Sequence, residues 1–397
     1  MIDRELKDVT EADLQRLIDT PVMEGDRIEY KGLLSLGTDD AKKKFLASIA
    51  SFANASGGDL IYGMEADNGC PVTLKALANF NSDANGIRIR DLIRTGIAPT
   101  VFTAEPRAVS LAQGGEVLVI RVRKTWAGAH MVTYNGDNRF YTRHGGARRM
   151  MDVAEIRSAF TLAESTVERV QRFRLERLSA ILTGDTPCPL NGKAALVFHI
   201  VPLRAFDPSF RPNLSVSDTL YTRLKPISGG GSLRQEFDGV YAADGTSTNE
   251  PEGYVFLFRN GALEVVDTGC LDAHGERRLI PGQSFEEHLL RGLPNWLAAL
   301  DSTGVEPPVV LMLSLLNAKG FAMGVGTGGR GHATHPISRD HLHVPGTILE
   351  TLSIESTNQD APINVFNVMR PHFDAVWNAC GYWQSLNYTA DGKWRLR

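Results

Sequence analysis

Acidic residues near the amino terminus are the first that could do chemistry. Glu24 precedes Glu29 and Lys31 by a short turn-like stretch, and Glu65 and Asp67 lie in a later acidic turn. Carboxylates are hard oxygen ligands that suit Mg²⁺ or Mn²⁺, and such an ion can activate water to cleave a phosphodiester. Lys31 could then offset charge on the scissile phosphate. The alternative is that the glutamates are a solvated surface pair and Lys31 their salt-bridge partner.

Basic residues of the same half could bind phosphate groups. Arg121 and Arg123 alternate along one expected strand, so both side chains point to the same face. Backbone contacts from such residues are independent of base sequence and sensitive to salt, and Trp126 and Tyr141 could stack bases. The alternative is that the arginines are ordinary solvated residues and the aromatic rings belong to the core. We assign nucleic-acid binding to Arg88, Arg90, Arg121, Arg123, Lys124 and Arg143, within a wider basic set that adds Arg94, Arg139, Arg148 and Arg149.

The elements that must position these residues can be read from periodicity. Apolar and polar residues alternate over 28–31, which predicts a half-buried strand with Glu29 and Lys31 on its open face. Glu24 would face the other way on one straight strand, so Gly25 and Asp26 must turn the chain if both glutamates line one site. Helical spacing predicts helices over 39–54 and 85–95, and short apolar runs predict strands over 59–64, 101–112, 116–125 and 139–145.

The second half has a different pattern. We expect a long amphipathic helix over 153–182 and a Pro/Gly-rich linker over 183–192. Arg259-Asn260-Gly261, between two apolar runs, predicts a hairpin. A helix or two, broken near Pro294, should precede a last helix over 370–386. The expected fold is α+β, with an amino-terminal domain over 1–152, a connecting helix over 153–184 and a second α+β domain over 185–397.

Bulk composition sets the class of protein. A chain of 397 residues with 43% hydrophobic and 22% charged residues fits a globular protein of two domains or slightly more. Its four cysteines have no metal-ligand spacing, and the charged amino terminus has no apolar signal segment, so we expect a cytoplasmic protein. The formal net charge of −4 is not the usual footprint of nucleic-acid binding, so any positive surface must be local.

Several motifs, in order, resemble the Schlafen AlbA-like domain over about residues 20–150. Glu24 and the run Ile28-Glu29-Tyr30-Lys31 match its first motif. Ser51-Phe52-Ala53-Asn54 followed by Gly57-Gly58 matches the helix end and Gly-Gly strand, with Ser51 where the family usually has alanine. The run from Ile61 to Glu65 and the run from Phe140 to Gly145 match the later elements.

The resemblance implies nucleic-acid binding. In members that cleave tRNA and rRNA it implies a metal-dependent endonuclease site, which here would comprise Glu24, Glu29 and either Glu65 or Asp67, with Mg²⁺ or Mn²⁺ as cofactor. The acidic turn is one residue longer than the family pattern, and Ala66 stands where aspartate is common. The sequence therefore predicts catalytic residues Glu24, Glu29, Lys31 and Asp67, and metal ligands Glu24, Glu29, Glu65 and Asp67.

Two functions remain open at this point. The first is an endoribonuclease acting on structured RNA such as tRNA, in defence or stress response. The second is a non-catalytic DNA-binding or nucleotide-binding regulatory protein whose second domain senses a ligand or partner. That domain could also bind another protein or form a homo-oligomer. ATP or another nucleotide would bind at the Gly57-Gly58 turn, where glycine allows close approach of the backbone.

Overall fold

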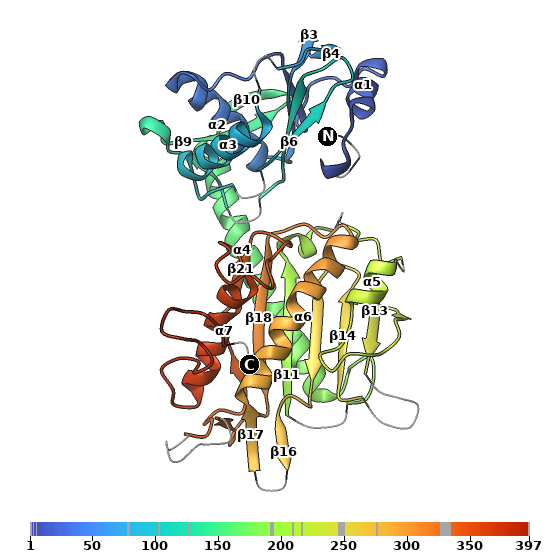
Figure 1. The fold of residues 1–397 in the computed structure, drawn as a ribbon, viewed down its shortest axis with the longest axis vertical. Helices are drawn as coiled ribbons and strands as arrows, with labels where there is room; N and C mark the ends of the chain where they lie inside the picture. The colour runs from blue at the N-terminus through green and yellow to red at the C-terminus, as the bar shows by residue number, and fades with distance from the viewer. Residues whose placement is uncertain are drawn as a thin grey trace. The chain divides into compact units, whose positions relative to one another are not determined.

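The computed structural model describes residues 2, 4, 6–77, 80–101, 104–125, 128–190, 194–208, 210–215, 217–244, 251–274, 277–325 and 335–395. The protein has an α+β fold and divides into two compact units, Met1–Thr166 and Val167–Arg397 (Figure 1). The division falls inside the long helix α4 (Val153–Thr183), and each unit has its own sheet and core. None of the helices in the described ranges is long and apolar enough to cross a membrane.

A four-stranded sheet forms the centre of the first unit. Its order is β1 (Ile28–Lys31), β2 (Gly58–Tyr62), β7 (Glu116–Val122) and β6 (Ala104–Ser110). β1 and β2 are parallel and the other pairs are antiparallel. All five residues of β2 are buried, because the sheet is covered on both faces. β6 is an edge strand, which leaves one side of its backbone without a strand partner in this sheet.

Helices cover both faces of this sheet. α2 (Asp39–Ala53) and α3 (Ser82–Gly96) pack on one face, where Phe52 and Leu60 join the same apolar cluster. α1 (Glu11–Asp19) packs on the opposite face with Ile61. Leu60 and Ile61 point to opposite sides because successive strand residues alternate. Both α2 and α3 begin at a capping side chain. The Thr38 hydroxyl accepts from Ala41 N at the start of α2, and the Asn81 side-chain carbonyl accepts from Ala84 N at the start of α3.

Smaller strands complete the first unit. A second sheet has the order β10-β9-β8-β5, and the β3–β4 hairpin turns at Asn68 and Gly69, both with positive φ. Asn54, at the end of α2, binds this second sheet. Its amide accepts from His130 N at 2.7 Å and donates to the carbonyls of His130 and Tyr141 at 2.8 and 2.9 Å. The elements are η1 (Leu6–Asp8), β3 (Met64–Asp67), β4 (Cys70–Leu74), β5 (Ile97–Ala98), β8 (Met131–Val132), η2 (Tyr134–Gly136), β9 (Arg139–His144) and β10 (Ala147–Met150).

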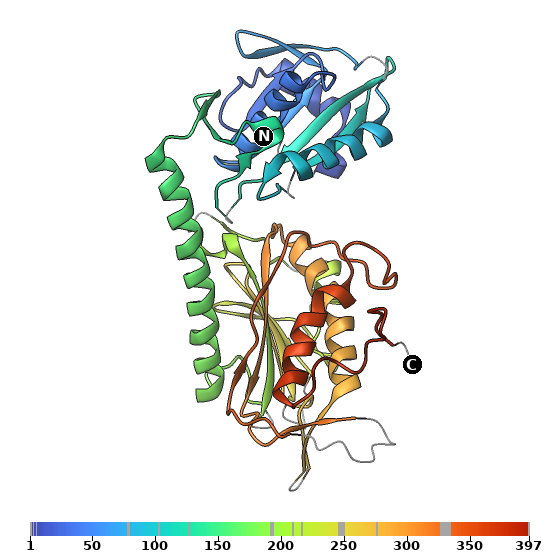
Figure 2. The ribbon, with the colours of Figure 1, turned by 90° about the vertical axis from the view of Figure 1, so that its left-hand side faces the viewer.

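An antiparallel eight-stranded sheet forms the second unit, in the order β12-β13-β14-β15-β11-β18-β20 with β21 also paired to β18. Helices α6 and α7 pack on one face and the second half of α4 on the other (Figure 2). The strands and helices of this unit are β11 (Ala195–Pro202), η3 (Leu203–Phe206), α5 (Asp218–Arg223), β12 (Arg234–Glu236), β13 (Gly239–Ala243), β14 (Gly253–Phe258), β15 (Leu263–Asp267), β16 (Asp272–His274), β17 (Arg277–Pro281), α6 (Gly282–Ser302), β18 (Val309–Leu316), β19 (Ala322–Gly324), β20 (Leu342–His343), β21 (Thr347–Leu349) and α7 (Val365–Ala379).

Two arginines fix the second half of α4 to this sheet. Arg174 is buried and donates to Ser314 Oγ at 3.0 Å and to the carbonyl of Leu313 at 2.6 Å. Arg177 makes a two-pronged ion pair with the fully buried Glu264, at 2.9 and 3.0 Å. Burial acts to raise the pKa of Glu264, but His199 and Arg177 outweigh it and lower that pKa to about 2.

Most predicted elements of the second half are present with altered ends. The hairpin at Arg259-Asn260-Gly261 is confirmed between β14 and β15. α6 is one helix that continues through Pro294, so the expected break is wrong. α7 begins earlier than expected because Asn364 caps it by accepting from Asn367 N, and the chain leaves the helix at Gly381, where φ is 85°.

Candidate nucleic-acid interface

Glu29 lies on β1 with both carboxylate oxygens occupied by cations of the chain. Lys31 Nζ lies 2.8 Å from Oε1, and the Arg143 guanidinium donates to Oε2. The Glu29 side chain is 12% exposed. Burial acts to raise its pKa, but Arg143 and Lys31 together hold the pKa below its ordinary value. Glu29 is therefore an ionised carboxylate neutralised by two neighbours.

Arg143 reaches Glu29 from β9 and is itself buried. Its guanidinium lies over the Phe52 ring, 4.0 Å from the centroid, and donates to the Gly146 carbonyl at 3.0 Å. Only 1% of its side chain is exposed. The prediction that Arg143 presents its charge to nucleic acid is wrong, because the guanidinium connects β1, α2 and the β9–β10 turn inside the domain.

The other predicted acids are held separately. Glu24 Oε1 accepts from Tyr30 N at 2.8 Å, and Glu24 N donates to the Gly69 carbonyl at 2.8 Å. Glu65 pairs with Lys75 at 2.7 Å. Asp67 lies at the tip of the β3–β4 hairpin, where Asn68 donates to its carboxylate at 3.3 Å. Gly69 brings this tip against Glu24, since a Cβ on Gly69 would lie 3.7 Å from that of Glu24.

These residues do not fit the expected metal site. A divalent ion needs several oxygen ligands at one point, free of competing cations. Among the residues that the structure describes, no group of three or more His, Cys, Asp or Glu side chains is placed to hold a metal ion. Glu29 already neutralises Arg143 and Lys31, and Glu65 neutralises Lys75. The arrangement therefore gives no support to Mg²⁺ or Mn²⁺ at these acids.

Arg121, on β7, is also unavailable to a ligand. Its guanidinium pairs with the buried Asp59 at 2.8 and 3.0 Å and donates to the carbonyls of Ile2 and Arg4. The residue is 7% exposed. The predicted exposed face with Arg123 is wrong, because the acid on the adjacent strand β2 and the amino-terminal segment enclose Arg121. Arg123 and Lys124 follow it and are half-buried, and Arg123 lies 3.4 Å from Glu105.

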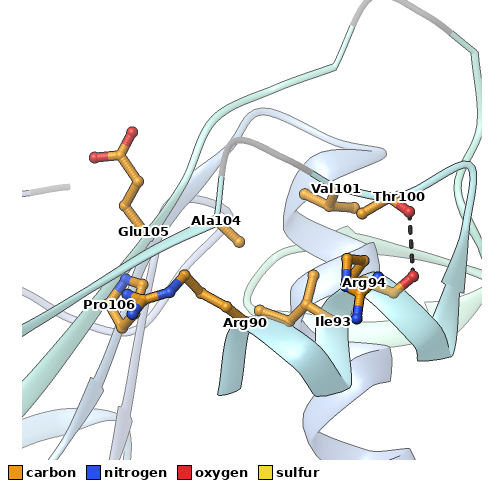
Figure 3. A pocket seen from close by; sticks show the side chains of 8 residues that line it. All are labelled: Arg90, Ile93, Arg94, Thr100, Val101, Ala104, Glu105 and Pro106. Carbon is orange, nitrogen blue, oxygen red and sulfur yellow. Dashed lines mark hydrogen bonds between the residues drawn. The ribbon is translucent and has the colours of Figure 1, made fainter. Parts of the chain in front are cut away.

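Arg88 and Arg90 of α3 are exposed but point to different sides. Arg88 donates to the Leu36 carbonyl at 2.9 Å. Arg90 has no ion pair or hydrogen bond within the described ranges and extends toward Pro106 of β6 (Figure 3). Residues two apart on a helix lie on nearly opposite faces, which explains the difference. Arg94 lies one turn beyond Arg90 and pairs with Asp91 at 3.3 Å while 66% exposed.

The space between α3 and β6 is a hollow of about 470 Å³. Figure 3 shows Arg90 and Arg94 on the helix side, with Thr100 donating to the Arg94 carbonyl at 3.2 Å. The lining residues are Arg90, Ile93, Arg94, Thr100, Val101, Ala104, Glu105 and Pro106. A second hollow of about 600 Å³ shares Arg90 and Pro106 and adds Arg107, an exposed residue of β6. Sequence analysis missed Arg107, although its place in the predicted 101–112 strand was a usable signal.

The packing around Gly57-Gly58 gives no support to the predicted nucleotide site. A Cβ at Gly57 would lie 2.7 Å from Lys124 N, and a Cβ at Gly58 would lie 2.5 Å from both the Arg27 carbonyl oxygen and the Phe52 ring. The space that the missing side chains leave is therefore filled by the chain's own atoms. Among the candidate stacking residues, Tyr141 is half-buried and donates to Asp137 at 2.9 Å, and Trp126 lies outside the described residues.

Comparison with known proteins gives a match to one family model and likenesses to solved structures. Residues 24–152 match the family model described as Schlafen, AlbA_2. The chain is also similar to the crystal structure of the DIP2311 protein from Corynebacterium diphtheriae, with 20% sequence identity and a TM-score of 0.27. That likeness covers 36% of this chain and 27% of the other, so the match spans about a quarter of that protein. A comparison with curated protein sequences found no match.

Proposed function

Residues 24–152 form a Schlafen AlbA-like domain, and on this premise we propose that the protein binds nucleic acid through its first unit. The match to this family, which suggests nucleic-acid binding, is the observation that carries the proposal. Arg90 on α3 and Arg107 on β6, which have no ion pair within the described residues, place two exposed cations on the surface of the domain although the chain has a formal net charge of −4. Such a surface supplies the phosphate contacts that dominate affinity for nucleic acids.

Binding without cleavage is the form that the geometry supports best. The finer prediction, a metal-dependent endoribonuclease acting on structured RNA, requires Glu24, Glu29 and a third acid to share one ion. Glu29 would have to exchange Arg143 and Lys31 for a metal, and Glu65 would have to leave Lys75. Since these ion pairs form within the domain itself, a metal would have to break them. We therefore propose binding, and the assay below tests for cleavage.

The test measures binding and cleavage on the same samples. Labelled single-stranded RNA, tRNA, single-stranded DNA and duplex DNA are titrated with the full chain, with and without Mg²⁺ or Mn²⁺. We expect the logarithm of the binding constant to fall linearly with the logarithm of the salt concentration. Binding should need no metal, and the nucleic acid should remain intact. No binding to any of the four at low salt would reject the proposed function.

A matched variant separates the two forms of the function. Glu29→Gln should bind as the wild type does, provided that its fold is intact by circular dichroism. Metal-dependent cleavage by the wild type that is lost in Glu29→Gln would establish the nuclease and overturn the non-catalytic form. Intact nucleic acid with both proteins, together with binding, would support the proposal as stated.

A further inference from the structure

Two adjoining hollows lie along the edge strand β6. The first, of about 470 Å³, lies between β6 and α3, and the second, of about 600 Å³, adjoins it at Arg90 and Pro106. Each has the volume of an ordinary small-molecule site. Because both contain the Arg90 side chain, one cation stands where the two hollows meet.

The cations at these hollows are free to meet a ligand. Arg90 and Arg107 are exposed and have no ion pair or hydrogen bond within the part of the chain that the structure describes. Arg94, one helical turn from Arg90, is paired only with the exposed Asp91, and an exposed pair of this kind contributes little to stability. Glu105 also lines the first hollow, but its carboxylate points away from Arg90 (Figure 3) and pairs with Arg123.

The rest of the lining suits a nucleoside. Ile93, Val101 and Ala104 are buried core residues that form an apolar floor under the first hollow, against which the face of a base can pack. The second hollow contains Glu11, whose Oε2 accepts from Ala112 N at 2.7 Å, and Glu116, and their other carboxylate oxygens are acceptors for amino groups of a base or hydroxyls of a sugar. A phosphate therefore fits at Arg90, where the mostly apolar first hollow meets the more polar second hollow.

We propose that β6 and α3 bind a single strand of RNA or DNA, with one nucleotide in each hollow and the linking phosphate at Arg90. This inference rests on the proposed function, and it specifies that the nucleic acid is single-stranded and that it binds along β6 and α3. Arg107 and Arg94 contact the flanking phosphates on either side. A duplex fits poorly, because its bases are paired and stacked and must be flipped out before they can enter a hollow.

The test uses the full chain and fluorescence anisotropy with a labelled oligonucleotide of mixed sequence. We expect Arg90→Glu to lower affinity at low salt about tenfold and Arg90→Glu with Arg107→Glu about a hundredfold, because each reversal removes a phosphate contact and adds repulsion. Arg157→Glu is the matched control, since Arg157 is exposed, lies outside both hollows and makes no ion pair within the described residues. It should bind as the wild type does.

Competition distinguishes the possible ligands. Unlabelled single strands of RNA and of DNA should displace the label, whereas a duplex of equal length and a nucleoside monophosphate should each compete at least about tenfold less well. Equal competition by the duplex would overturn the strand state, and equal competition by the monophosphate would overturn the two-nucleotide site.

The two proposals fail in different ways. If the wild type binds no nucleic acid, the proposed function and this inference fail together. If the wild type binds but the double reversal binds equally well, the inference alone fails and the interface lies elsewhere. If Arg157→Glu weakens binding as much as Arg90→Glu, the effect is one of overall charge and the assignment to the hollows is wrong.

Discussion

Two regions of the first unit contain arginine in opposite circumstances. At the centre of the sheet, Arg121 pairs with Asp59 and Arg143 pairs with Glu29, and all four side chains are buried or nearly so. At the edge of the sheet, Arg90 and Arg107 are exposed on α3 and β6. Arginine beside a buried carboxylate connects elements of the fold, whereas an exposed arginine that makes no ion pair within the described residues remains available to a ligand. Residue type alone does not separate the two.

The second unit repeats the central arrangement. Arg177 pairs with the fully buried Glu264, which also accepts from Tyr254 at 2.8 Å and contacts His199 at 3.0 Å. This carboxylate has a pKa of about 2, lowered by its neighbours against the effect of burial. Arg177, like Arg174, therefore attaches α4 to the sheet of the second unit.

The largest expected effect is that of removing the central cation. Arg121→Met leaves Asp59 buried without its ion-pair partner, and should lower the free energy of unfolding by about 3–5 kcal/mol. Urea denaturation measures the loss. The double variant Asp59→Leu with Arg121→Met removes both charges and should be more stable than the single variant. An Arg121→Met protein as stable as wild type would contradict the structural role of this pair.

Arg143 should give the next largest effect. Arg143→Met removes the buried partner of Glu29 while Lys31 remains, so we expect a loss of about 2–3 kcal/mol in unfolding free energy. Lys31→Met removes the half-exposed partner and should cost less than about 1 kcal/mol, because water replaces that contact. Equal losses in the two variants, by the same denaturation assay, would show that burial does not distinguish these two partners.

The pH dependence of stability sharpens the same comparison. Because the folded protein holds the pKa of Glu29 below its ordinary value of 4.5, the ionised carboxylate stabilises the protein above that pH. This contribution disappears as pH falls from about 4.5 through the lowered pKa of the folded state. Glu29→Gln should therefore lose less stability than wild type between about pH 7 and about pH 3. Parallel pH profiles would mean that the pKa of Glu29 is not shifted.

The smallest effect on stability should come from the edge. Arg90→Gln should change the free energy of unfolding by no more than about 0.5 kcal/mol, because Arg90 has no partner within the described residues to lose. The same variant should reduce the slope of log affinity against log salt concentration by about 1. A destabilised Arg90→Gln protein with an unchanged salt slope would remove the distinction between edge and centre.

Much of the fold could be predicted because its signals are local. The alternation over 28–31, the helical spacing of Phe45, Ile49 and Phe52, and the turn at Arg259-Asn260-Gly261 each depend on neighbours a few residues away. The break expected at Pro294 was wrong because packing of α6 against the sheet maintains the helix after loss of one backbone donor. The observed helix ends differ from the predicted ones where the capping residue lies outside the apolar pattern. Asn364, which caps α7, is an example.

The candidate site divides between local and long-range information. Alternation correctly placed Glu29 and Lys31 on one face, and they do contact one another. It could not show that Arg143, more than a hundred residues later, supplies the second partner. It also placed Arg121 and Arg123 on one face without revealing that Asp59 and the amino-terminal segment cover that face at Arg121.

By itself the sequence determined the family of residues 24–152, the α+β class and the main helices and strands. Motif order and periodicity depend only on residues close together along the chain. Only the tertiary structure decided which charges remain for a ligand. Asp59 reaches Arg121 across the β2–β7 strand pair, and Glu29 on β1 reaches Arg143 on β9 of the other sheet. Coulomb attraction depends on distance in space and on burial, and neither can be read from separation along the chain.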